Sequence, residues 1–78
     1  MRAPPSIDEA VSTNLERYFS DLDGSEPSAI YDMVIRAVER PMLAIVMQHA
    51  NGNQSRASEM LGINRNTLRK KLNQYGLL

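Results

Sequence analysis

The apolar run at residues 42–47, Met-Leu-Ala-Ile-Val-Met, limits how this chain can fold more than any other feature. It lies within residues 30–50, a stretch without glycine whose length predicts a helix rather than a strand. A helix that is apolar on every side must be covered on every side. A chain of 78 residues, with no cysteine for disulfides or metal ligation, cannot be expected to provide that cover alone. The run therefore predicts an obligate homodimer whose core is shared between two copies.

The predicted dimer core consists of apolar residues of this long helix. In the first half of the helix the polar residues cluster on one side, which leaves a wide apolar arc. Pro41 removes one backbone hydrogen bond and predicts a kink near residues 37–41. The residues expected in the dimer core are Met33, Val34, Ala37, Val38, Met42, Leu43, Ile45, Val46 and Met47.

An extended leader, residues 1–6, is expected to precede a first amphipathic helix. Ser6-Ile7-Asp8-Glu9 has the spacing of a capping box, in which the serine hydroxyl and the glutamate carboxylate each satisfy a backbone N–H. Apolar residues then recur with a helical period until Asp23-Gly24, which predicts a helix at about residues 7–22. The two helices together form a predicted dimerisation region, residues 7–50.

Two short helices are predicted in the last third of the chain. Gly52 is expected as the C′ residue of the long helix, and Asn53 as the N-cap of a helix at about residues 54–61. Gly62 interrupts this helix, and Asn64 caps the last one. No segment predicts a strand, so the expected fold class is all-α with four helices in each subunit. The residues expected to face inward are Ala57, Met60, Leu61, Ile63, Leu68, Leu72 and Tyr75.

Charge is distributed unevenly along a chain whose net charge is zero. Residues 1–50 carry four arginines against eight acidic residues, whereas residues 51–78 carry five basic residues against one glutamate. A basic segment on an otherwise acidic chain indicates a polyanionic partner for that segment, most simply nucleic acid. Two short helices joined by a glycine-containing turn, the second of them basic, are also typical of a helix-turn-helix. Residues 51–78 are therefore predicted to be a DNA-binding helix-turn-helix.

The same segment resembles a known family. The similarity extends upstream to Tyr18-Phe19 and to residues 38–48, and the family is that of Fis, the bacterial nucleoid protein known as the factor for inversion stimulation. The resemblance implies that the first two helices of each subunit intertwine into a homodimer and that the last two read DNA. The segments that carry it are Gly52-Asn53-Gln54-Ser55-Arg56-Ala57, Leu61-Gly62-Ile63-Asn64-Arg65-Asn66-Thr67-Leu68-Arg69-Lys70-Lys71-Leu72 and Tyr75-Gly76.

The resemblance also implies how such a protein acts on double-stranded DNA. The recognition helices of the family lie closer together than the roughly 34 Å that separates the half-sites of ordinary helix-turn-helix dimers. DNA bending and indirect reading of flexible or narrow-groove sequences are therefore expected. The implied function is a sequence-tolerant, nucleoid-associated transcriptional regulator of the bacterial cytoplasm.

Matching positions of the family's motif imply the DNA contacts. Arg65 is expected to read a base, since its guanidinium can contact guanine O6 and N7, and Asn64 is expected to contact a base edge. For Asn53 and Asn64 a purely capping role stays open, as does a purely solubilising role for Lys71. The residues expected to contact phosphate are Asn53, Ser55, Thr67, Arg69, Lys70 and Lys71.

The sequence departs from the family's pattern at three places. Asn66 stands where the closest relatives have glycine, and Asn73-Gln74 stands where they have two lysines, which predicts a smaller phosphate footprint. Only residues 1–6 precede the first helix, whereas longer members carry a mobile β-hairpin arm that activates DNA invertases. The resemblance therefore gives little support for recombinase stimulation.

Two other functions stay open from the sequence. The same motif ends the NtrC-type transcriptional activators, so an alternative is the DNA-binding and dimerisation domain of such an activator. A structural helical dimer without nucleic acid is the other. An enzyme is not expected, because the chain has one histidine, no cysteine and no glycine-rich phosphate loop. No cofactor, metal or membrane partner is expected, and the absence of signal and membrane segments predicts a cytoplasmic location.

Overall fold

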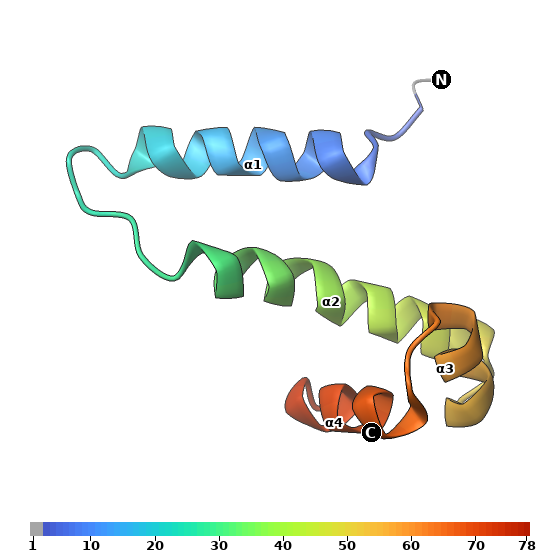
Figure 1. Cartoon of the computed structure of the whole chain (residues 1–78). Helices are drawn as coiled ribbons and strands as arrows, with labels where there is room; N and C mark the ends of the chain where they lie inside the picture. The colour runs from blue at the N-terminus through green and yellow to red at the C-terminus, as the bar shows by residue number, and fades with distance from the viewer. Residues whose placement is uncertain (1–2) are drawn as a thin grey trace. The chain divides into compact units, whose positions relative to one another are not determined.

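The structure, a computed structural model, describes residues 3–78 and consists of four helices over that range (Figure 1). No strand occurs in the described part, so the all-α fold class is confirmed. Each predicted helix is present close to its expected bounds. The helices are α1 (Ile7–Asp21), α2 (Ile30–His49), α3 (Gln54–Leu61) and α4 (Arg65–Gln74).

The start of α1 is capped by Ser6, but only half of the predicted capping box forms. The Ser6 hydroxyl accepts a hydrogen bond from the backbone N–H of Glu9 at 3.3 Å. The same hydroxyl donates to the carboxylate of Asp8, and this bond lowers the pKa of Asp8. Among residues 3–78 the Glu9 carboxylate makes no return bond to the backbone N–H of Ser6. The acidic side chain that contacts Ser6 is that of Asp8.

The chain divides into two compact units within α2. The first unit ends at Val34, and the second spans Ile35–Leu78. The predicted division between residues 50 and 51 is one of function and stays a prediction. The later part of α2 lies in the same compact unit as α3 and α4. The reason is that Leu43 and Ala50 of α2 are buried in the same core as residues of the two short helices. α2 itself continues through Pro41, and the expected kink near residues 37–41 stays a prediction.

The core of the second unit covers one side of the run at residues 42–47. Val46 and Met47 pack against this core. Other sides of the run stay exposed at Met42 and Ile45, so the expectation that one chain cannot cover it on every side stays a prediction. The fully buried core residues are Leu43, Ala50, Ala57, Leu68 and Leu72.

Met60 is the one residue of α3 whose predicted inward placement is wrong, because its exposed fraction is 49%. The covered side of α3 runs through Gln54, Ala57, Ser58 and Leu61, which recur at the spacing of a helix face. Met60 lies off this stripe. Spacing alone did not show that Met60 is exposed, because apolar residues occur on more than one side of this short helix.

The end of α2 shows a second difference from the prediction. Asn51, with φ 54°, takes the left-handed C′ position, and Gly52, with φ 78°, follows it. The N–H of Asn51 donates to the carbonyl of Gln48 at 3.1 Å, and that of Gly52 to the carbonyl of Met47 at 3.0 Å. This is the Schellman pattern with Asn51 at C′, because asparagine tolerates the left-handed region better than most residues.

Gly62 ends α3 with φ 75°, and its replacement tests how much the turn depends on glycine. A Cβ at this position would meet no atom within 4 Å, so the cost of Gly62→Ala is that of the left-handed backbone alone. We expect the free energy of unfolding to fall by about 1–2 kcal/mol. Urea denaturation at a fixed protein concentration measures it. Gly62→Asn is the control and should lose less; an alanine variant as stable as the wild type would contradict the prediction.

Candidate nucleic-acid interface

The helices α3 and α4 form a pair joined by a turn at residues 62–64. Small buried side chains, Ala57 and Ser58, allow the two helices to pack closely, and Leu68 of α4 is fully buried. The Ser58 hydroxyl donates to the carbonyl of Ser55 at 2.8 Å, so this buried polar group is satisfied. Gly62 donates its N–H to the carbonyl of Ser58 at 2.9 Å and turns the chain toward α4. The predicted helix-turn-helix architecture is therefore present.

Both asparagines that were predicted to cap the short helices do so. The Asn53 side-chain oxygen accepts from the backbone N–H of Arg56 at 3.1 Å, and that of Asn64 from Asn66 at 2.8 Å. Each cap uses only the carbonyl oxygen of the amide and leaves its NH₂ group to donate elsewhere. Capping is thus compatible with a contact to DNA by the same side chain.

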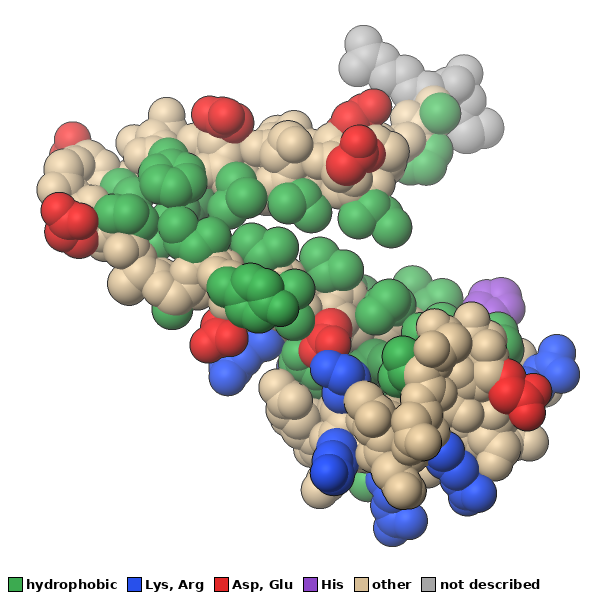
Figure 2. All heavy atoms as spheres, viewed as in Figure 1, with side chains coloured by type: hydrophobic (Ala, Val, Ile, Leu, Met, Phe, Trp, Pro, Cys, Tyr) green, Lys and Arg blue, Asp and Glu red, His purple; other side chains and the backbone are tan. Residues whose placement is uncertain are grey.

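Three basic residues of α4 are exposed, Arg65, Arg69 and Lys70, and we call them the cationic row. Helical spacing places Lys70, with Asn66 and Asn73, on the side away from the buried leucines, and Arg69 beside them. Arg65 begins the helix on the side of Leu68 and Leu72 but is exposed there. Figure 2 shows lysine and arginine side chains standing out from the surface of the C-terminal unit. Thr67 is also exposed, whereas Ser55 is half-buried in the first turn of α3. The row can therefore reach a ligand without any rearrangement of the core.

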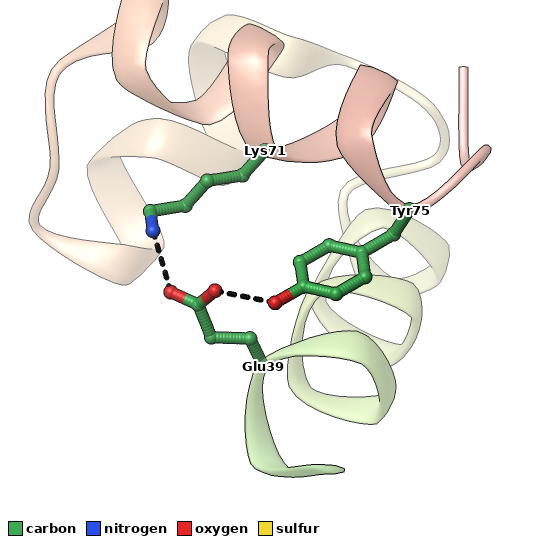
Figure 3. A network of polar contacts seen from close by, with 3 residues as sticks. All are labelled: Glu39, Lys71 and Tyr75. Atoms are coloured by element: carbon green, nitrogen blue, oxygen red, sulfur yellow. Dashed lines mark hydrogen bonds and ion pairs between the residues drawn. The ribbon is translucent and has the colours of Figure 1, made fainter. Parts of the chain in front are cut away.

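Lys71 does not belong to this row, because its ammonium is held by Glu39 of α2 (Figure 3). The distance from Lys71 Nζ to Glu39 Oε2 is 2.6 Å, and the Tyr75 hydroxyl donates to Glu39 Oε1 at 2.7 Å. These two hydrogen bonds lower the pKa of Glu39. The Lys71 charge is thus compensated within the chain.

Sequence reasoning missed Glu39, which it placed only among the polar residues of α2. One signal was available. Glu39 precedes Leu43 by one helical turn, in the stripe that continues through Val46 and Ala50. An acidic residue at the end of a buried stripe is expected to find a partner, since an unpaired charge there is costly.

Comparison with known proteins identifies the family. Residues 34–75 match the family model described as "Bacterial regulatory protein, Fis family". The chain belongs to the Fis family. A relative from Neisseria meningitidis serogroup A is 60% identical over 74 residues, which cover 95% of this chain and 94% of the relative. One from Ralstonia nicotianae is 57% identical over 72 residues, which cover 92% and 94%. Both relatives carry the description of a Fis-like DNA-binding protein.

The match to the Fis family covers most of the unit that contains Glu39, the cationic row and the helix-turn-helix. The resemblance read from the sequence is therefore confirmed. No helix among residues 3–78 is both long and apolar enough to cross a membrane. Over the same range, no three histidine, cysteine or acidic side chains are grouped as ligands for a metal ion.

The ion pair between Glu39 and Lys71 predicts a pH-dependent stability. The folded chain lowers the pKa of Glu39 below its ordinary value of 4.5, so the ionised carboxylate stabilises the fold above that pH. This stabilisation is lost as the pH falls through the lowered pKa. Glu39→Gln should therefore lower the free energy of unfolding by about 1 kcal/mol at pH 7, and the difference from wild type should shrink below pH 4.5.

Urea titrations at several pH values measure this difference. Glu59→Gln is the matched control, because Glu59 is an exposed carboxylate of α3 that makes no ion pair with any described residue. A difference between Glu39→Gln and wild type that stayed constant from pH 7 to acid would show that the charge of Glu39 is not what stabilises the contact.

Proposed function

We propose that this Fis-family chain is a homodimeric DNA-binding transcriptional regulator associated with the bacterial nucleoid. The observation that carries the proposal is the exposed cationic row on α4, the second helix of a helix-turn-helix. The descriptions of the relatives as DNA-binding proteins support the same partner. Those relatives are covered over 94% of their own length, which favours a small regulator over the tail of an NtrC-type activator.

The proposed DNA contacts separate base reading from phosphate binding. Arg65 and Asn64 lie at the start of α4, where a recognition helix meets base edges, and we assign them to base contact. Lys71, which the sequence grouped with the phosphate contacts, is assigned to holding α4 on α2 because Glu39 binds its ammonium. The residues assigned to phosphate contact are Asn53, Ser55, Thr67, Arg69 and Lys70.

The proposed dimer uses the sides of α2 that the helix-turn-helix does not cover. Met42 is 42% exposed and Ile45 is 56% exposed, although both belong to the apolar run. Val34 and Val38 precede Ile45 at helical spacing and complete an apolar stripe. Apolar side chains along α2 are visible at the surface in Figure 2. Such a stripe favours a second copy as its cover, and we propose that residues 7–34 take part in the same dimer.

The predicted dimer core thus divides into two groups in the structure. Leu43 is fully buried within the chain, and Val46 and Met47 pack against the same core. We propose that these three support the helix-turn-helix. The partner chain then contacts the other residues, Met33, Val34, Ala37, Val38, Met42 and Ile45. Two recognition helices in one such dimer would bend DNA to reach both half-sites, as in the family.

Replacing Ile45 by aspartate tests the dimer. Ile45 lies outside the chain's own core, so the change should place an unpaired charge only in the interface between copies. Sedimentation equilibrium at micromolar concentration should show a dimer of 8.8-kDa chains for wild type and loss of that dimer for Ile45→Asp. Met60→Asp, at an exposed apolar residue of α3, should stay dimeric. A folded wild-type monomer would refute the proposed dimer.

Two alanine variants test the division of DNA contacts. Arg65→Ala should weaken binding to the preferred sequence by about 1–3 kcal/mol and relax base preference, since a bidentate base contact is lost. Lys70→Ala should weaken all sequences about equally, because phosphates are the same in each. Fluorescence anisotropy with several duplexes measures both effects. If both variants weaken every duplex to the same extent, Arg65 does not read a base.

A further inference from the structure

An open pocket in the second unit lies between α2 and the end of α4. Its volume is about 330 Å³, and it is lined by Arg36, Arg40, Gln74 and Tyr75. Arg36 and Arg40 are one helical turn apart on α2, so both side chains can line the same space. Neither of the two interpretations of the sequence, dimer core or basic C-terminal segment, included these arginines.

The electrostatics of this pocket favour an anion. Two like charges at this spacing repel each other on a helix surface, so the pair does not stabilise α2. Neither Arg36 nor Arg40 makes an ion pair with any carboxylate among residues 3–78. Glu39, the acidic residue between them in sequence, is already bound by Lys71 and Tyr75. Neither guanidinium is therefore held in an ion pair; the other acidic residue of α2, Asp32, lies one helical turn before Arg36.

The pocket continues the cationic row of α4. Gln74 lines the pocket and follows Lys70 by one helical turn. A helix of 10 residues is about 15 Å long, which exceeds the roughly 12 Å width of the DNA major groove. When the start of α4 meets base edges, its end is thus expected to lie beside a sugar–phosphate strand. No cation of α4 is available there, because Asn73 and Gln74 are neutral.

We propose that the pocket binds one backbone phosphate of the DNA, held by Arg36 and Arg40 with Gln74 as an additional donor. This inference rests on the proposed DNA-binding function and adds two residues of α2 to its contact surface. Guanidinium groups fit the task because their planar forks donate paired hydrogen bonds to phosphate oxygens. The Gln74 amide can donate one more. A dimer would then hold two additional phosphates, one in each pocket.

The salt dependence of DNA binding tests the pocket. Each phosphate contact contributes about −0.9 to the slope of log K against log salt, so two pockets contribute about −1.8. The double variant Arg36→Gln/Arg40→Gln should therefore have a slope shallower by about 2 than the wild type. Anisotropy titrations of a duplex over a salt series give both slopes. Thermal unfolding verifies that the variant is folded, and sedimentation equilibrium that it is dimeric, before the comparison.

Two controls make the result specific. Arg36→Lys/Arg40→Lys keeps both charges but loses the paired hydrogen-bond donors of the guanidinium groups. It should keep most of the salt dependence of the wild type and bind DNA more weakly. Arg17→Gln removes an exposed charge of α1 and should leave the slope unchanged. An equal change of slope in Arg17→Gln would show a general effect of charge and would refute the proposed phosphate contact.

The outcomes also separate this inference from the proposed function. A wild-type chain that binds no duplex at low salt, or whose slope is no steeper than about −2, would refute DNA binding itself. A steep wild-type slope that the folded double variant retains in full would refute only the phosphate pocket. That second result would leave an anionic group of another macromolecule as the occupant to be sought.

Discussion

Burial of one side of α2 beneath α3 and α4 is the contact on which the rest of the second unit depends. Leu43 and Leu72 come from helices far apart in sequence, and both are fully buried in this core. Burial of a leucine side chain stabilises a fold by about 1.5–3 kcal/mol. The same contact fixes where the recognition helix lies with respect to α2. A short helix such as α4 would be marginal in water without it.

The ion pair between α2 and α4 contributes orientation more than free energy. The side chains of Lys71 and Glu39 are 32% and 17% exposed, and partly exposed ion pairs are weak contributors to stability. The geometry is nevertheless specific, because one carboxylate receives both the ammonium of Lys71 and the phenol hydroxyl of Tyr75, the C-cap of α4. Rotation of α4 about its own axis would break both bonds. Apolar burial therefore holds the helix in place, and Glu39 selects the face that it presents.

Local features of this structure could be predicted from the sequence, and long-range contacts could not. The N-caps Asn53 and Asn64 and the turn at Gly62 depend on residues within a few positions, so capping rules located them. The side of α2 that is covered depends on distant residues, since Leu43 shares its core with Leu68 and Leu72, 25 and 29 positions away. Helical periodicity identifies an apolar stripe on α2 but does not identify the residues that cover it. For the same reason the sequence showed Lys71 as a cation and not its bond to Glu39, 32 residues away.

The pairing of charges in the fold changes where the cationic surface lies. Counting by segment gives a basic character to residues 51–78 and an acidic character to residues 1–50, which include α2. In the folded unit, however, Lys71 is compensated by Glu39, whereas Arg36 and Arg40 of α2 have no ion-pair partner among the described residues. A polyanion responds to the charges that remain uncompensated, because only these displace its counterions. The proposed DNA-binding surface of the second unit therefore consists of the α4 row and of the two α2 arginines that share a pocket with Gln74.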